Sequence, residues 1–234
     1  MRSSILRLNH LTSIRIALAA TLAVAACGSK SAPPVLTAPS APSSIGVDPV
    51  RVRRVVVLGD SLAVSPSREQ GFPSELQARI TRQGLPWTVT NAGSTGDTTA
   101  GGLGRVRSLL TSDVGVLVVA LGANDGLRGV PISTIDKNLS AIIEMAKQQN
   151  IAVLLCGMET PPTRGWDYTV AFHYVFPDLA QRYSIPLVPF LLAGVALSPD
   201  LNGPDGIHPN AAGAQRIADT VWPYLQPLLV GVPV

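Results

Sequence analysis

The 234-residue chain predicts an α/β fold, a three-layer α/β/α sandwich built around a parallel sheet. Segments with the pattern of strands alternate along the chain with segments that have the pattern of helices, as in parallel sheets. Residues 114–121 are apolar throughout, which is typical of a central strand covered on both faces. Small and polar residues follow three of the expected strands, and we expect them to meet at one edge of the sheet.

The expected strands are short apolar runs rich in β-branched residues. They are residues 54–58, 87–91, 114–121, 151–156 and 187–190. The expected helices have apolar residues three or four positions apart. They are residues 70–83, a helix with Leu103, Val106 and Leu110 on one face, a helix with Ile135, Leu139, Ile142 and Ala146 on one face, residues 168–182, and residues 209–225. Ser133 and Asp136 are spaced like a capping pair at the start of the third helix.

Residues 1–26 are predicted to be a signal peptide, because three arginines and no acid accompany an apolar run too short to span a bilayer. Residues 24–27, Val-Ala-Ala-Cys, resemble a bacterial lipobox, in which the cysteine becomes the lipidated first residue. We therefore expect Cys27 to carry a lipid that anchors an exported protein to the membrane. Residues 23–25, Ala-Val-Ala, also form an ordinary cleavage site, which would release a soluble protein.

Residues 27–50 are rich in Ala, Pro and Ser and predict an extended tether, and residues 51–234 are predicted to form one compact domain. The signal segment holds three of the 18 basic residues and none of the 15 acidic ones, so the mature charge is balanced. We therefore expect no nucleic-acid partner. The sequence favours no particular oligomeric state.

With Cys27 lipidated, the second cysteine of the chain, Cys156, has no partner for an internal disulfide. Cys156 lies in the apolar run 151–156 and is predicted to be a packing residue. The sequence contains no cluster of Cys and His residues with the spacing of metal ligands, so we expect neither a metal nor a cofactor.

Residues 59–62, Gly-Asp-Ser-Leu, follow the first expected strand. A buried strand that ends in a serine, beside a glycine that permits a sharp turn, can present a nucleophile at the edge of a sheet. Ser61 is therefore the candidate nucleophile, and Asp60 is expected to hold the turn. The alternative is that both residues only cap the next helical segment.

A base for Ser61 is expected at His208, which lies in a loop rich in Gly and Pro ahead of the last helix. Asp205 stands three residues earlier and can accept the Nδ1 proton, which leaves Nε2 free to take a proton from Ser61. The alternative for Asp205 is an Asx turn with Gly206. His173 lies in the expected helix 168–182, where a surface or core role is favoured.

Four blocks together resemble the SGNH, or GDSL, hydrolase family. In chain order they are Gly-Asp-Ser-Leu at 59–62, Gly96 within Ser-Thr-Gly-Asp-Thr, Gly-Ala-Asn-Asp at 122–125, and Asp-Gly-Ile-His-Pro at 205–209. Residues 122–129 are similar to the bacterial thioesterase/lysophospholipase-like branch that includes arylesterases. The common α/β-hydrolase motif Gly-x-Ser-x-Gly does not match, because Ala63 stands where its last glycine would be.

The resemblance implies a flavodoxin-like sheet and a triad of Ser61 as nucleophile, His208 as base and Asp205 as its orienter. It also implies an oxyanion hole made of the Ser61 and Gly96 backbone N–H groups and the Asn124 side-chain amide. The expected reaction is cofactor-free hydrolysis of aryl, short-chain or lysophospholipid-type esters through an acyl-enzyme. The alternatives are a carbohydrate O-acetyl esterase, an acyl thioesterase, and a lipid-anchored binding module without turnover.

Overall fold

The computed structural model describes residues 52–231, which contain a parallel sheet of five strands in the order β2-β1-β3-β4-β5. The strands are β1 (Arg53–Gly59), β2 (Trp87–Gly93), β3 (Val114–Ala120), β4 (Ala152–Cys156) and β5 (Leu187–Val188). All four neighbouring pairs are parallel. This strand order confirms the flavodoxin-like sheet. The predicted signal peptide, Cys27 and the tether lie outside the described residues.

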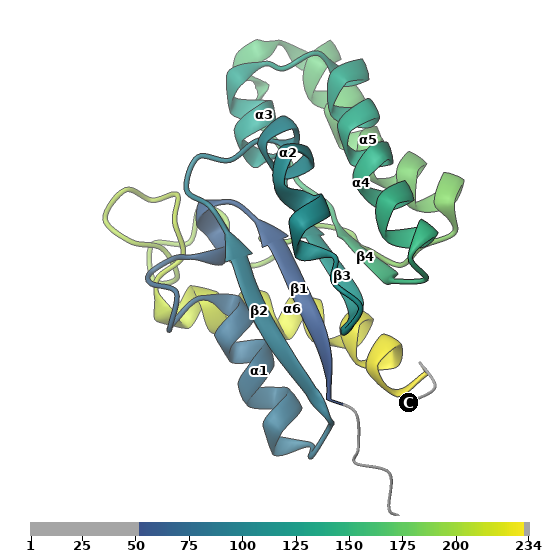
Figure 1. The fold of residues 1–234 in the computed structure, drawn as a ribbon. Helices are drawn as coiled ribbons and strands as arrows, with labels where there is room; N and C mark the ends of the chain where they lie inside the picture. Colours follow the sequence, from purple (N-terminus) through teal and green to yellow (C-terminus); the bar gives the residue numbers. More distant parts are fainter. Residues whose placement is uncertain (1–51, 232–234) are drawn as a thin grey trace, which may run out of the picture. The chain divides into compact units, whose positions relative to one another are not determined.

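Helices lie on both faces of the sheet (Figure 1). α1 (Phe72–Arg82) and α6 (Ala211–Val230) pack together on one face, and α2 (Thr99–Leu109), α4 (Ile132–Gln148) and α5 (Trp166–Tyr183) form the layer on the other. Three shorter helical segments are the 3-10 turns η1 (Ser61–Ala63) and η2 (Pro162–Arg164) and the helix α3 (Ala123–Arg128). The three-layer prediction is thus confirmed. Within residues 52–231, no helix has the length and apolarity needed to cross a membrane.

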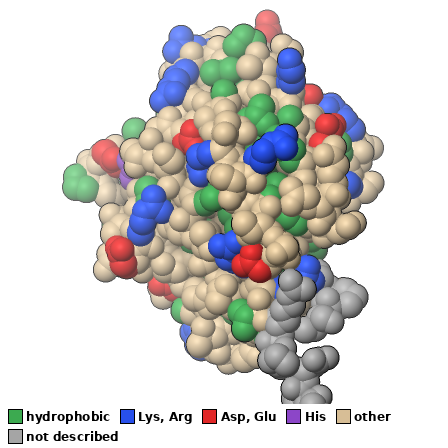
Figure 2. All heavy atoms as spheres, viewed as in Figure 1, with side chains coloured by type: hydrophobic (Ala, Val, Ile, Leu, Met, Phe, Trp, Pro, Cys, Tyr) green, Lys and Arg blue, Asp and Glu red, His purple; other side chains and the backbone are tan. Residues whose placement is uncertain are grey.

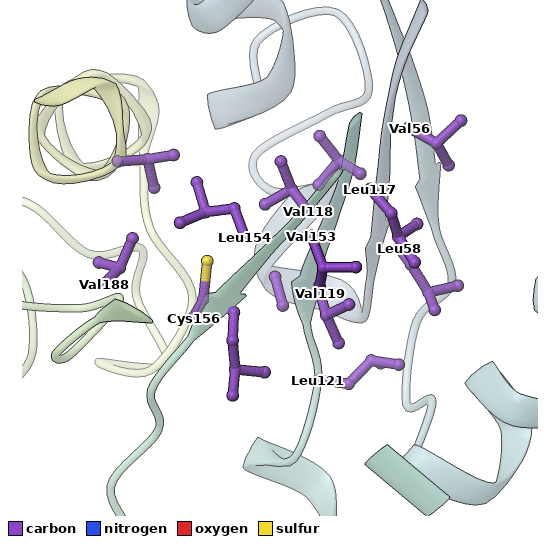
Figure 3. Close-up of a cluster of buried hydrophobic side chains, with 14 of the residues drawn as sticks. Val56, Leu58, Leu117, Val118, Val119, Leu121, Val153, Leu154, Cys156 and Val188 are labelled. Atoms are coloured by element: carbon purple, nitrogen blue, oxygen red, sulfur yellow. The ribbon is translucent and has the colours of Figure 1, made fainter. Parts of the chain in front are cut away.

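The core lies on both faces of the central strands. Every residue of β3 is buried, as the unbroken apolar pattern predicts for a strand between two helix layers. Figure 3 shows Cys156 at the end of β4 in the same cluster as Leu154 and Val188. Burial raises the pKa of the Cys156 thiol to about 12, which keeps it protonated and unreactive. Its predicted packing role is confirmed.

The predicted capping pair at the start of α4 is wrong. The helix begins at Ile132, because the carbonyl of Pro131 already accepts hydrogen bonds from the N–H groups of the residues three and four positions later, 134 and 135. Ser133 therefore lies inside the first turn. Asp136 instead pairs with Arg182 of α5 at 3.0 Å.

Three other elements differ from the prediction. The segment after β3 forms the short helix α3, which the sequence pattern did not indicate because it has six residues and no apolar periodicity. Gly122 precedes it with a φ of 122°, a conformation that favours glycine. β5 is shorter than expected, and α6 starts at Ala211 after an Asn210 side chain that accepts the Gly213 N–H at 3.0 Å.

Two glycines at the ends of β1 and β2 make room for η1. Gly59 and Gly93 are partners in the parallel register. A Cβ atom at either position would lie 2.9 Å from the Cβ of Ala63, the last residue of η1. The turn that carries Ser61 can therefore lie directly on the ends of these two strands.

We expect Gly93→Ala to lower the free energy of unfolding by about 1–3 kcal/mol, because the added methyl group overpacks the contact with Ala63 and Val64. Urea unfolding measures the change. Gly104→Ala on α2 is the matched control, because its Cβ meets nothing within 4 Å, and we expect it to be neutral or stabilising by up to about 1 kcal/mol. Equal stability of the Gly93 variant and the wild type would contradict the packing argument.

Candidate active site

Ser61 and His208 meet at the carboxyl edge of the sheet although they are 147 positions apart in the chain. Ser61 is the first residue of η1, immediately after β1. The turn is held by Asp60 Oδ1, which accepts the Leu62 N–H at 2.9 Å, and by Ser61 O, which accepts the Val64 N–H at 3.1 Å. His208 Nε2 lies 2.9 Å from Ser61 Oγ, which is hydrogen-bonding distance.

Asp205 uses its two carboxylate oxygens for different purposes. Oδ1 accepts the backbone N–H groups of Ile207 and His208, both at 3.0 Å, which makes the Asx turn. Oδ2 lies 2.6 Å from His208 Nδ1. The structure therefore contains both the Asx turn and the contact with His208 Nδ1, which the sequence had offered as alternatives. The hydrogen bond with the His208 side chain, and after it the two backbone hydrogen bonds, hold the pKa of Asp205 well below its usual range. The side chain of Asp205 is therefore a carboxylate at neutral pH.

The loop that carries Asp205 and His208 is fixed by an internal framework. The buried side-chain amide of Asn202 donates to the carbonyls of Val195 and Ser198, at 2.7 and 2.8 Å. Across the base of the loop, Gly203 N donates to His208 O at 2.7 Å. Sequence reasoning missed Asn202, because an asparagine in a loop rich in Gly and Pro has no distinguishing spacing.

Gly96 and Asn124 follow the ends of the two strands that flank β1. Gly96 lies in the turn after β2 with a φ of 74°, and its carbonyl accepts a hydrogen bond from Arg128 Nη2 at 2.9 Å. Asn124 is the second residue of α3, directly after β3, and its Nδ2 donates to Asp60 Oδ2 at 3.3 Å. Within residues 52–231, the backbone N–H groups of Ser61 and Gly96 have no protein acceptor. They are donors that a ligand can use.

Asp60 is completely buried beside Ser61. Burial is the main reason that its pKa is raised to about 6, and hydrogen bonds from the Leu62 N–H and from Asn124 offset part of this effect. Asp97 raises the pKa of Asp60 further through its charge, and His208 lowers it. The expectation that Asp60 holds the turn is confirmed by its bond with Leu62.

Arg105 of α2 joins three segments at this edge. Its guanidinium donates to the carbonyls of Gly59 at 3.0 Å and Ala92 at 2.6 Å, and its Nε donates to Asp97 Oδ2 at 2.8 Å. The ends of β1 and β2 and the turn that holds Gly96 are thus tied to one side chain. This role could not be predicted from the sequence, because the carbonyl groups that Arg105 binds belong to residues far from it in the chain.

A buried network fixes the helix that carries Asn124. Asp125 accepts hydrogen bonds from Thr99 N at 2.9 Å and Thr99 Oγ1 at 2.6 Å. Asn138 of α4 donates to the same Thr99 hydroxyl at 3.1 Å. Tyr168 of α5 donates to the Val130 carbonyl at 2.8 Å, just beyond the end of α3. α2 and α5 therefore hold α3 directly, and Asn138 of α4 supports the Thr99 hydroxyl that binds Asp125.

His173 is not part of this site. It lies on the exposed side of α5, and its Nδ1 is 2.6 Å from Glu159 Oε1, so of the surface and core roles that the sequence favoured, the structure shows the surface one. In the part of the chain described, residues 52–231, no three His, Cys, Asp or Glu side chains are grouped so that they could hold a metal ion.

The arrangement has the parts that acyl transfer needs. A hydroxyl lies next to an imidazole, the imidazole lies next to a carboxylate, and uncommitted N–H groups lie at the same edge of the sheet. The side chains of His208 and Asp205 are 39% and 50% exposed, so solvent reaches the base.

Comparison with known proteins agrees with this chemistry. Residues 57–216 match the GDSL-like lipase/acylhydrolase family. The esterase TesA of Pseudomonas aeruginosa is 40% identical over 178 residues, which cover 75% of this chain and 89% of that protein. The thioesterase 1/protease 1/lysophospholipase L1 of Escherichia coli K12 is 35% identical over 178 residues, covering 75% and 84%.

A solved structure shows the same fold. The psychrotrophic esterase EstA from Pseudoalteromonas sp., inhibited by monoethylphosphonate, superposes with a TM-score of 0.71 and 28% identity, over 76% of this chain and 99% of that one. The resemblance inferred from the four sequence blocks is therefore confirmed: the chain belongs to the GDSL-like lipase/acylhydrolase family.

Proposed function

We propose that the chain is a serine esterase that hydrolyses carboxylic esters through an acyl-enzyme on Ser61. The observation that carries this proposal is the continuous chain of contacts from Asp205 Oδ2 to His208 Nδ1, at 2.6 Å, and from His208 Nε2 to Ser61 Oγ, at 2.9 Å. The family and the relatives named esterase support the reaction class independently.

The reaction has two halves. In the first, Ser61 Oγ attacks the ester carbonyl carbon while His208 Nε2 takes the hydroxyl proton. The tetrahedral intermediate then breaks the bond to the leaving oxygen, which receives that proton and departs as an alcohol. In the second, water attacks the acyl-enzyme, His208 passes the water's proton to Ser61, and the acid is released. Ionised Asp205 holds the imidazole and stabilises its positive charge.

Three donors are proposed for the oxyanion: the backbone N–H groups of Ser61 and Gly96 and the Asn124 side-chain amide. They come from the ends of β1, β2 and β3, so the parallel sheet brings them to one edge. Such donors are oriented before the charge develops, and this makes them effective in the transition state. No metal or cofactor takes part in the proposed steps.

Aryl, short-chain and lysophospholipid-type esters are the proposed substrates. Acyl thioesters are an alternative substrate class that this location disfavours, because an exported enzyme would not meet cytosolic acyl-CoA. Figure 2 shows Lys and Arg side chains interspersed with Asp and Glu over the visible face, which provides no broad positive field for so anionic a ligand. Carbohydrate O-acetyl esters are an alternative substrate class, and a binding module without turnover is the alternative to an enzyme.

The proposed location is a membrane surface that faces the periplasm or the cell exterior. Residues 1–26 would be removed as a signal peptide, lipidated Cys27 would anchor the protein, and residues 27–50 would serve as the tether to the catalytic domain, residues 51–234. Cleavage after residues 23–25 would instead release a soluble exported enzyme.

Ser61→Ala should abolish hydrolysis of a panel of acetyl to long-chain aryl esters, lysophospholipids and acetylated sugars, because Ser61 is the one hydroxyl or thiol that contacts His208 Nε2 within residues 52–231. The same variant should lose labelling by a fluorophosphonate probe. The substrates that the wild type turns over identify the ester class. A folded wild type that neither reacts with the probe nor hydrolyses any ester would favour the binding module.

Asn124→Ala should lower kcat by about 10²–10³-fold, because it removes one donor to the oxyanion. KM should change little, since the Asn124 amide binds the oxyanion mainly in the transition state. Steady-state kinetics with an aryl ester measure both constants. Wild-type kcat in this variant would exclude Asn124 from the oxyanion hole.

Cys27→Ala should move the protein from the membrane fraction to the soluble fraction, because the lipid attachment site is lost. Fractionation of expressing bacteria, with detergent extraction of the wild type, measures the change. Unchanged membrane association of the variant, or a wild type that is already soluble, would contradict lipid anchoring.

A further inference from the structure

Asp60 has a second carboxylate oxygen that the turn does not use. Oδ1 accepts the Leu62 N–H, and Oδ2 accepts a hydrogen bond from Asn124 Nδ2 at 3.3 Å. We propose that Asp60 is a positioning residue that holds the Asn124 amide with its amino group toward the oxyanion. This inference rests on the proposed function, because it gives Asp60 a role only through the oxyanion hole.

The chemistry of the amide explains why a partner is needed. An asparagine side chain has an amino nitrogen and a carbonyl oxygen of similar size, so packing alone does not choose between its two orientations. If Asn124 Oδ1 faced Asp60 Oδ2, two acceptors would be in contact. The carboxylate thus selects the orientation in which Nδ2 lies beside residue 60, and therefore beside Ser61. The second N–H of that nitrogen is left for the substrate.

The surrounding network fixes the backbone of Asn124 and leaves its side chain to Asp60. Asp125 binds Thr99 of α2, and Tyr168 of α5 binds the Val130 carbonyl, so α3 is held from two helices. Among the residues described, Asp60 is the one protein partner of the Asn124 amide. Loss of this contact therefore frees the side chain without moving the helix.

The turn by itself does not require a carboxylate. One acceptor is enough for the Leu62 N–H, and serine is a good residue at such a position because its hydroxyl supplies that acceptor. A fully buried carboxylate is the costlier choice, because it loses its hydration. Serine could not take the role of Oδ2, because its oxygen is attached one bond nearer the backbone and would not reach both Leu62 N and Asn124 Nδ2.

Two substitutions separate the turn from the positioning contact. Asp60→Asn keeps the size of the side chain but has one acceptor oxygen, so it can satisfy Leu62 or Asn124 and not both. Asp60→Ser keeps the acceptor for Leu62 and removes the atom that reaches Asn124. Each is made in the wild type and in Asn124→Ala, and kcat and KM are measured with one aryl ester on the full chain.

We expect each Asp60 substitution to lower kcat at least about tenfold in the wild type, with KM changed less than about threefold. In the Asn124→Ala background the same substitutions should change kcat less than about twofold, because the group they act through is gone. An equal loss in both backgrounds would overturn the positioning role and leave the esterase proposal intact. Wild-type kcat in Asn124→Ala would instead overturn the proposed oxyanion hole.

A spectroscopic measurement tests the contact without turnover. The side-chain NH₂ resonances of Asn124, identified by their absence in Asn124→Ala, should shift in both Asp60 variants. Those of Asn202, which donates to the Val195 and Ser198 carbonyls, are the control and should stay in place. Unmoved Asn124 resonances would contradict the inference. Failure of both Asp60 variants to fold would also overturn it, since Asp60 would then be required for the fold itself.

Discussion

The close packing of η1 on the ends of β1 and β2 is the constraint on which the rest of the site depends. Gly59 and Gly93 lack side chains where Ala63 approaches, so the chain can turn immediately after β1 and present Ser61 at the edge of the sheet. The parallel register then brings the ends of β2 and β3 to the same edge. A larger residue at either glycine would push the turn away from the strands and change the position of the nucleophile relative to its partners.

Each polar group at this edge is oriented by a partner that does not itself need to touch the substrate. Asp205 holds His208 and also closes its own turn, and Asp60 holds both its turn and Asn124. Arg105 binds the strand-end carbonyls of two neighbouring strands. Such shared contacts reduce the freedom of the donors before a substrate binds, which is the condition for effective electrostatic stabilisation of a transition state.

Several parts of the structure could be predicted from particular residues, and others could not. The strand pattern at 114–121 and the polar residues after three strands predicted the sheet and the edge at which Ser61, Gly96 and Asn124 lie. The helix α3 was missed, since its stability comes from Asp125 and Thr99, which are 26 positions apart, and not from a periodic pattern. The assignment of Ser133 and Asp136 as a capping pair was wrong, because Asp136 has a partner, Arg182, on another helix.

The sequence by itself determined the alternation of the five strands with the five longer helices, the serine, histidine and aspartate proposed as a triad, and the family to which the chain belongs. These properties are local, since they depend on apolar periodicity, turn residues and short motifs. Only the tertiary structure decided that His208 Nε2 lies 2.9 Å from Ser61 Oγ, that Arg105 joins two strand ends, and that Asp60 contacts Asn124. Contacts between segments far apart in the chain depend on how the sheet and its helices pack, and no spacing within the sequence records them.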